Sequence, residues 1–545
     1  MTIRKLSVSC LLVVLIGLAA LPAAAQSFQV QCPTKTITHP NAANNNSEPA
    51  YQGPTAFSTG TGGYLVPTAN VNGAIKCQQI SGGDGFASMG DGTQTYLFAF
   101  GPLSGLTDIA NGKPGTEFPN IFNTVYGGTL VSGDPATTDG ATSGPNPLST
   151  FPYNGAVGLA PNLDAIASGS CTAPCLDGHV DPRPIMDVGV MNGTMPAPLF
   201  AIDEDDEFFL TLTNVGQVMR PDLFEQHTVH FHGYPNASSF YDGVPDASVA
   251  INIGGSFTYY YLAPDAGTYF WHCHITPPEH LQMGMVGQLY VRPRQNRVLA
   301  SQTLYAALQQ QQGDPRTRCD SSDILCSNPL PSVAGSAMGG GMYAYNDGDG
   351  STRYDVEYPI QIHGFDPNFH FVGMTFNPEG FTDMKDKHFL LNGRSYPDTV
   401  TAGPLATQST DGSMHYSQPL PSIINIPAGG RALLRLSSLD VAEHQTLASL
   451  GIPMQVVALN AKLLRDQAGK NLYYNTNSIT LGGGESLDVI LDASDTAKYH
   501  SGQIFYLYTP NLDHLSNDAE NFGGLMTEVH ICGSVTGTTY GNSCL

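Results

Sequence analysis

Histidine, cysteine and methionine gather in two short segments of this 545-residue chain, HTVHFHG at 227–233 and FWHCHITPPEHLQMGMVG at 270–287. The whole chain holds only 16 His and 15 Met, so this spacing indicates a metal site. Two imidazoles, a thiolate and a weak thioether are the ligands of electron-transfer copper, whereas zinc has no use for a thioether. The spacing Cys-x6-His-x4-Met also lets one loop supply three ligands. The residues predicted to bind this copper are His227, Cys273, His280 and Met285.

Four more histidines flank these ligands and predict a second metal site. Side chains alternate between the two faces of a strand. His230 and His232 therefore share one face of their strand. His272 and His274 likewise share a face, and Cys273 between them points the opposite way. One short strand thus serves two sites, with a thiolate inside the sandwich and two imidazoles on an outer face.

The remaining methionines near these segments have simpler explanations. Met283 lies in the ligand loop, but Met285 has the better spacing, so Met283 is expected to pack in the core. Met338 and Met342 could bind Cu(I), since thioethers are soft ligands. Their loop, GSAMGGGMYAYNDGDG, is so rich in glycine that a flexible connection with incidental methionines is the preferred interpretation.

Short β-type segments separated by turn residues must position these side chains. They predict an all-β fold, which the 60 Gly and 39 Pro also suit. A polar stretch rich in Gly and Thr runs to about residue 90, and the first strand is expected at 95–103. A long loop-rich insertion follows over about 104–185. Later strands are expected in DEFFLTLTN, HTVHFHG, SFTYYYLA, GTYFWHCH and MVGQLYVRP.

The second half of the chain repeats the first in outline, which predicts two β-sandwich domains. INIPAGGRALLRLSS, SLDVILDAS, GQIFYLYTPN and GGLMTEVHI follow the order of the first-half strands. YLYTPNL stands in the place of FWHCHI, so the second domain is expected to carry no copper ligands, and neither His444 nor His514 is expected to bind one. The predicted parts are a signal peptide (1–25), a copper-binding domain (26–295), a linker (296–354) with a helix at 296–312, and a second domain (355–545).

The start of the chain is typical of an exported protein. Arg4 and Lys5 precede an apolar run that ends in small residues at 23–25, so a secreted or periplasmic location is expected. No other segment is apolar for long enough to span a membrane. The excess of 46 acidic over 22 basic residues argues against nucleic acid as a partner. Export favours disulfides, and the expected pairs are Cys32/Cys77, Cys171/Cys175, Cys319/Cys326 and Cys532/Cys544, with Cys273 free.

The two metal-type segments resemble those of a known family. HTVHFHG is similar to the H-x-x-H-x-H-G motif of multicopper oxidases, and HCHITPPEHLQMGM resembles their H-C-H…H…G-M motif. The resemblance is close over about 186–295 and extends in outline over 355–535. It implies two cupredoxin-like Greek-key sandwiches, with type 1 copper on the four ligands named first.

The same resemblance implies roles for the remaining histidines. His230 would hold type 2 copper, and the type 3 pair would be held by His232, His272 and His274. YDGVP resembles a turn near the oxygen site of the family, which makes Asp242 a candidate proton donor. An aspartate before glycine is also a common turn former.

The resemblance implies a laccase-like oxidoreductase. It would take single electrons from a phenol or a low-valent metal ion at the type 1 copper and reduce dioxygen to water. Two alternatives stay open. A copper nitrite reductase-like enzyme would carry Asp where this chain has His230 and would lack the second histidine of HCH. An electron-transfer cupredoxin would use the type 1 copper alone.

Two features depart from the family pattern. The loop from Cys273 to His280 is two residues longer than usual. More importantly, the family's oxygen-reducing cluster uses eight histidines from two domains, and this chain shows four. A second copy of the first domain would supply an equivalent four across a two-fold contact. A homo-oligomer with a first-domain to first-domain contact is therefore expected.

Overall fold

The computed structural model describes most of the chain. The described residues are 35–41, 48–102, 159–161, 168–170, 176–180, 193–217, 219–220, 223–233, 238–263, 265–313, 329–373, 380–408, 412, 414–518, 520–537 and 542–545. The expected signal peptide and most of the expected insertion lie outside these residues, as do Cys32, Cys171, Cys175, Cys319 and Cys326. The described parts of the insertion contain one two-stranded ladder, β5 (Leu159–Pro161) with β6 (Leu176–Val180).

The first domain is a sandwich of two four-stranded sheets. One sheet has the order β10-β8-β3-β4 and the other β7-β12-β11-β9. The strands of the first are β10 (Ser256–Leu262), β8 (Glu207–Gly216), β3 (Ile75–Ser88) and β4 (Gln94–Pro102). Those of the second are β7 (Phe200–Asp203), β12 (Val286–Arg292), β11 (Gly267–His272) and β9 (His230–His232). Aromatic and aliphatic side chains from both sheets fill the space between them, as the alternating sequence pattern requires.

The polar stretch before residue 90 contains a central strand, so the expectation that strands begin at 95 was wrong. β3 has 14 residues and lies between β8 and β4. Its sequence hid it, because Gly82, Gly83 and Gly85 interrupt the apolar alternation. Tertiary contacts require two of these glycines. A Cβ at Gly82 would lie 2.8 Å from the ring of His227, and one at Gly85 would lie 2.0 Å from the carbonyl oxygen of Gly193.

The second domain is a larger sandwich of the same kind. Its larger sheet has the order β16-β15-β20-β26-β22-β23, with β24 also paired to β22, and its smaller sheet β19-β28-β27-β21-β25. The larger sheet comprises β16 (His388–Leu391), β15 (Val356–Phe365), β20 (Arg431–Ser438), β26 (Glu485–Asp492), β22 (Met454–Leu459), β23 (Lys462–Leu463) and β24 (Tyr474–Thr476). The smaller comprises β19 (Ile424–Pro427), β28 (Met526–Cys532), β27 (Ile504–Tyr508), β21 (Gln445–Leu450) and β25 (Ser478–Leu481). The predicted all-β fold with two cupredoxin-like sandwiches is confirmed.

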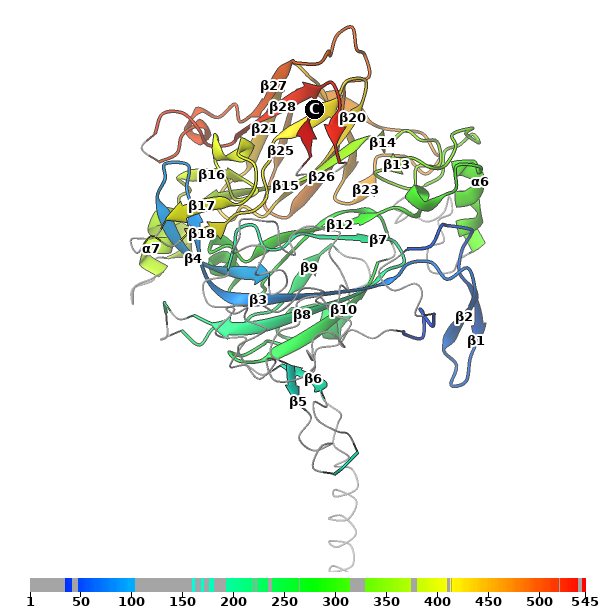
Figure 1. The fold of residues 1–545 in the computed structure, drawn as a ribbon, viewed down its shortest axis with the longest axis horizontal. Helices are drawn as coiled ribbons and strands as arrows, with labels where there is room; N and C mark the ends of the chain where they lie inside the picture. Colours follow the sequence, from blue (N-terminus) through cyan, green and yellow to red (C-terminus); the bar gives the residue numbers. More distant parts are fainter. Residues whose placement is uncertain are drawn as a thin grey trace, which may run out of the picture.

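The two domains pack through sheet faces rather than through loops alone. In Figure 1 the second domain, coloured yellow to red, covers the first-domain sheet that contains β12 and β9, and β11 contacts β20 and β26. Thr268 donates a hydrogen bond of 2.6 Å to Asp488 across this contact. Arg292 pairs with Glu357 at 2.5 Å. Burial alone would raise the pKa of Glu357, but Arg292 and Arg435 beside it hold that pKa below its usual value. The interface therefore contains satisfied charges as well as apolar packing.

The linker contains a shorter helix than the sequence predicts. α6 spans Leu304–Gln309, between the 3-10 turns η5 (Arg294–Arg297) and η6 (Gln310–Gly313). Helix does not extend back to 296 because Val298 and Thr303 form β-bridges, with Tyr51 and Met338 respectively. Long-range pairing overrides the local helical pattern here.

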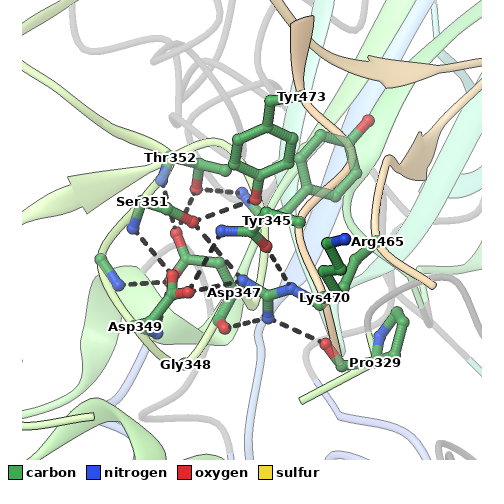
Figure 2. A network of polar contacts seen from close by, with 12 residues as sticks. Pro329, Tyr345, Asp347, Gly348, Asp349, Ser351, Thr352, Arg465, Lys470 and Tyr473 are labelled. Atoms are coloured by element: carbon green, nitrogen blue, oxygen red, sulfur yellow. Dashed lines mark hydrogen bonds and ion pairs between the residues drawn. The ribbon is translucent and has the colours of Figure 1, made fainter. Parts of the chain in front are cut away.

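The Gly-rich loop beyond α6 is held by an arginine of the second domain (Figure 2). Asp347 folds the loop by accepting hydrogen bonds from the N–H groups of Asp349 and Thr352, at 3.1 and 2.7 Å. Arg465 lies 2.8 Å from the carboxylate of Asp349 and donates to the carbonyl of Pro329 at 2.9 Å. The guanidinium thus supplies the positive charge that this acidic loop needs.

One of the expected disulfides lies within the described residues. Cys532 and Cys544 are bonded, which ties the end of β28 to the C-terminal β30 (Ser543–Cys544). Cys273 is free and buried, as expected. None of the described helices has the length and apolar character needed to cross a membrane.

Candidate metal centres

Three of the predicted ligands of the first site meet inside the first domain. His227, Cys273 and His280 each offer a donor atom, and these atoms lie within 4.8 Å of one another. His280 Nδ1 is 3.3 Å from Cys273 Sγ. His227 forms a bridge with Ile251 before β9, Cys273 follows the last residue of β11, and His280 lies in α5 (Pro277–Gln282). All three side chains are fully buried.

Met285 belongs to the same buried group. It precedes β12 and packs in the core cluster that contains Cys273. The Cys273 N–H donates to the Met285 carbonyl at 3.2 Å, and the Met285 N–H donates to the His280 carbonyl at 2.9 Å. These two bonds fix three ligand-bearing residues relative to one another. Met283 is buried in the same core.

The electrostatics of this group fit a metal ion. Burial alone would raise the pKa of the Cys273 thiol, but His280 and His227 hold it well below its usual value. The N–H of Thr228 also donates to the sulfur at 3.4 Å. Neither ring nitrogen of buried His227 bonds to an oxygen or nitrogen atom of the described residues. A buried thiolate beside imidazoles that have no oxygen or nitrogen partner on the metal-facing side would be satisfied by a soft metal ion.

The other four predicted histidines form a second cluster on the outer face of the same sheet. β9 and β11 are antiparallel, with His230 opposite His272. The ring of His230 lies 5.8 Å from that of His232, 5.3 Å from that of His272 and 5.1 Å from that of His274. The strand alternation thus gathers four imidazoles within contact range, although His274 itself lies beyond the end of β11.

Hydrogen bonds orient two of these rings. His230 Nδ1 donates to the carbonyl of Asp242 at 2.6 Å, and His272 Nδ1 donates to the carbonyl of Cys273 at 2.8 Å. An imidazole that donates from Nδ1 keeps Nε2 as a metal ligand. Burial, with the neighbouring histidines, lowers the pKa of His272 to about 3 and also lowers that of His232. These two rings are therefore neutral at physiological pH, as metal binding requires.

Asp242 lies at the edge of this second cluster. Its carboxylate Oδ2 is 3.5 Å from His230 Nδ1, so its main-chain carbonyl makes the closer contact with that ring. Gly243 has φ +81°, and a Cβ there would meet the carbonyl of Val229 at 2.0 Å, which explains the Asp-Gly pair. The carboxylate is partly exposed.

Comparison with known proteins identifies the segment that carries both clusters. Residues 178–296 match the family model described as multicopper oxidase. The chain is 34% identical over 109 residues to laccase abr2 of Aspergillus fumigatus, a match that covers 20% of this chain and 17% of that protein. The chain carries a multicopper oxidase domain.

The similarity is local to this multicopper oxidase domain. A 92-residue match of 34% identity to multicopper oxidase MmcO of Mycobacterium tuberculosis covers 17% of each protein. A copper-containing nitrite reductase of Rhizobium meliloti is 33% identical over 109 residues, which are 19% of this chain and 26% of that one. The chain therefore spans a fifth or less of the laccase and oxidase relatives. The solved structure of multicopper oxidase mgLAC has a TM-score of 0.44 at 16% identity, covering 85% of this chain and 88% of that one.

Several residues around the candidate site were not found from the sequence. The carboxylate of Glu225 lies 3.6 Å from His280 Nε2, on the side of the ring away from Cys273. Thr228 accepts a bond from the His274 N–H at 2.9 Å and so links the two clusters. Their closeness to His227 in the sequence was a weak sign that Glu225 and Thr228 belong to the site. A single carboxylate or hydroxyl has no spacing pattern by which it could be recognised.

His514 and His444 of the second domain have other surroundings. His514 stacks on Phe389, with ring centroids 3.8 Å apart, and its Nε2 is 3.0 Å from Glu443. His444 is exposed beside Gly482. A Cβ added at nearby Gly484 would lie 3.4 Å from His232, so a second-domain turn borders the four-histidine face.

Met285→Leu is expected to retain the visible band of the copper-loaded domain and to raise the reduction potential, because the loss of a weak thioether donor would destabilise Cu(II) most. Spectroscopy with redox titration measures both. Met283→Leu is the matched control, since it removes a buried thioether two residues away and should leave the potential unchanged. If the reduction potential of the control shifts as much as that of Met285→Leu, Met285 is not a copper ligand.

Proposed function

We propose that this chain is an exported, secreted or periplasmic, copper-dependent oxidase of the laccase-like class. It would oxidise a phenol or a low-valent metal ion by single electrons and reduce dioxygen to water. The observation that supports this most directly is the adjacency of the two histidine clusters. Cys273, buried in the first cluster, lies in the chain between His272 and His274 of the second. A short covalent path therefore joins the two sites.

The residues of the first site would hold type 1 copper and those of the second the type 2 and type 3 coppers. When bound, copper supplies the one-electron chemistry and the site of dioxygen reduction. The protein's part is to fix geometry and access. His227, Cys273, His280 and Met285 form a buried ligand set, while Glu225 connects the far edge of the His280 ring to solvent with a side chain 26% exposed.

The four-histidine cluster favours the oxidase over both alternatives. A nitrite reductase-like site with a single catalytic copper has no use for four converging imidazoles, and a type 1-only electron carrier has no use for any of them. His230 and His272 are nevertheless oriented by hydrogen bonds of 2.6 and 2.8 Å, which is the support that metal-binding histidines usually receive. Asp242, 3.5 Å from His230, is the proposed proton donor to the oxygen-reducing face.

The test is the stoichiometry of the full-length, copper-loaded protein. With catechol or ferrous ion as the probe, each dioxygen consumed should oxidise four equivalents of one-electron donor and release no hydrogen peroxide, because four electrons and four protons convert dioxygen to two waters. An oxygen electrode and a peroxide assay measure this. A blue protein that consumes no oxygen but reduces nitrite would favour the copper nitrite reductase-like alternative over the oxidase.

The missing four histidines lead us to propose a homodimer, or a larger assembly that contains one. Two first domains related by a two-fold axis would contribute two copies of each cluster histidine. Two His230 rings would then serve type 2 copper, and the six remaining rings would serve the type 3 pair. His232 is exposed in the single chain, as such an arrangement needs.

Oxygen consumption per chain is expected to fall on dilution through the dissociation range, while the visible band per chain stays constant. The reason is that the type 1 site lies within one chain, whereas the cluster would need two. Sedimentation and oxygen uptake over one dilution series would measure the two together. A fully active monomer would contradict the assembly and leave the type 1 assignment intact.

A further inference from the structure

Gln282 joins the ligand loop of the first domain to the second domain. It is the last residue of α5, two positions after His280 and three before Met285, and it is fully buried. Its Nε2 donates to Asp386 Oδ1 at 3.0 Å, and its Oε1 accepts from the N–H of Asp366 at 3.2 Å. Both partners of its amide group therefore belong to the second domain.

The main chain of Gln282 also contacts the second domain. Its carbonyl oxygen lies 2.9 Å from Nε2 of His370, in α7 (Pro367–Gly373), whose ring stacks on Phe365 at 3.7 Å. α7 also contacts β4 of the first domain (Figure 1). His370 Nδ1 is 2.6 Å from the carbonyl of Tyr96 in β4. One buried ring thus spans from the first-domain sheet to the end of α5.

The anchor at Asp386 is a pair of buried carboxyl groups. A Cβ added at Gly364 would lie 2.0 Å from Asp386 Oδ2 and 2.7 Å from Asp440 Oδ2, so the two oxygens face the same point. Asp440 is fixed by Glu443 N–H and Gln445 Nε2, at 2.9 and 2.7 Å. Burial and then Asp440 raise the pKa of Asp386 to about 9. Asp386 is therefore protonated at neutral pH, because burial and the neighbouring carboxyl group disfavour its charged form.

A neutral Asp386 is compatible with the bond from Gln282. Its protonated Oδ2 faces Asp440 and can donate to it, and its Oδ1 accepts from the Gln282 amide. Further charged groups around the pair are Glu443, which adds to the repulsion, and His363, which faces Asp440. Asp386 Oδ1 is thus a fixed hydrogen-bond acceptor for the Gln282 amide at the end of α5.

α5 needs such an external support. It has only six residues, and its N-cap, Thr276, has φ +37° and makes no side-chain cap bond. Helices of this length are not stable on their own in water. Leu281 adds one apolar contact, with the cluster formed by Phe270, Val286 and Leu439. Contacts from the second domain therefore add to the first-domain bonds that hold α5 and its loop.

We propose that Gln282 is a positioning residue for the metal ligands, through which the second domain holds α5 on the Asp386–Asp440 pair. The second domain would then have a direct part in a site to which it gives no ligand. This inference rests on the proposed type 1 site for its spectroscopic consequences, but the mechanical contact can be tested without metal.

The experiment compares Gln282→Met with Gln288→Met in the full-length protein. Gln288 is a matched control, because it is also buried at the domain contact and donates to Arg435 O at 2.8 Å and Ser437 Oγ at 3.0 Å, but from β12. In the copper-free protein, amide hydrogen exchange over 277–285 should become at least about tenfold faster in Gln282→Met only. Equal protection of this segment in the two variants would overturn the proposal.

The copper-loaded variants give the second readout. Gln282→Met should shift the type 1 reduction potential and lower copper retention at that site about tenfold, as the loss of outer support commonly does. Gln288→Met should change neither. If the wild-type protein shows no type 1 spectrum, the proposed function fails, while the exchange data still decide the role of Gln282.

The role of a protonated Asp386 is tested by Asp386→Asn and Asp386→Ala. Asparagine can accept from Gln282 and donate to Asp440, so it should behave like the wild-type neutral acid in exchange and copper retention. Alanine removes both bonds and should reproduce Gln282→Met. An asparagine variant as defective as the alanine variant would overturn the anchoring by a protonated Asp386. If Gln282→Met does not fold, these two Asp386 variants still test whether the second domain positions α5.

Discussion

Cys273→Ser is expected to abolish the intense blue band of the copper-loaded protein and to reduce donor oxidation to background. The band arises from charge transfer between a thiolate and Cu(II), which a hydroxyl cannot replace. The structure gives Cys273 the conditions for a thiolate, since His280 and His227 lower its pKa and Thr228 donates to its sulfur at 3.4 Å. Absorption and electron paramagnetic resonance of the variant measure the loss.

The control for this prediction removes the disulfide-bonded pair Cys532 and Cys544. Cys532→Ser combined with Cys544→Ser deletes a disulfide 12 residues apart in sequence, at the far end of the second domain. It should cost about 3 kcal/mol of stability and leave the blue band unchanged. Circular dichroism confirms that each variant is folded. A Cys273→Ser protein that stays blue would contradict the assignment of Cys273 as the thiolate ligand of copper.

His232→Ala is expected to impair the second site and to leave the first site intact. Dioxygen reduction should fall about 100-fold or more, because one of the rings proposed to hold the type 3 coppers is lost, while the blue band stays. His232 is suited to this test because it is exposed in the single chain, so its removal leaves no core cavity. Oxygen uptake, visible absorption and copper content, measured together, check the result.

His444→Ala is the matched control for His232→Ala. His444 is also exposed and lies beside Gly482 in the second-domain turns that border the same face. As it is not expected to bind copper, its loss should leave copper content and oxygen uptake nearly unchanged. Loss of one copper per chain in this variant would instead favour the nitrite reductase-like arrangement, in which the second domain of a neighbour supplies a ligand.

The sequence by itself determined which side chains gather in the candidate site. Residue type and local spacing were sufficient, because alternation along β9 and β11 decides which imidazoles share a face. The ring distances of 5.1 to 5.8 Å from His230 to the other three histidines follow from that rule. The all-β fold and its duplication were equally readable, since turn residues and strand patterns recur in order through both halves. The Cys532–Cys544 disulfide also followed from a short separation.

Only the tertiary structure decided the surroundings of that site. β3 was hidden because its glycines serve contacts with His227 and Gly193, which lie more than 100 residues away in the sequence. The bonds of Asp366 and Asp386 to Gln282 were equally invisible, since no local pattern relates an amide in one domain to a main-chain N–H and a carboxyl group some 80 to 100 residues later. Local spacing encodes which ligands a strand or loop can present. Their exact placement depends on long-range packing, because the short helix that bears His280 has too few contacts of its own to fix its position.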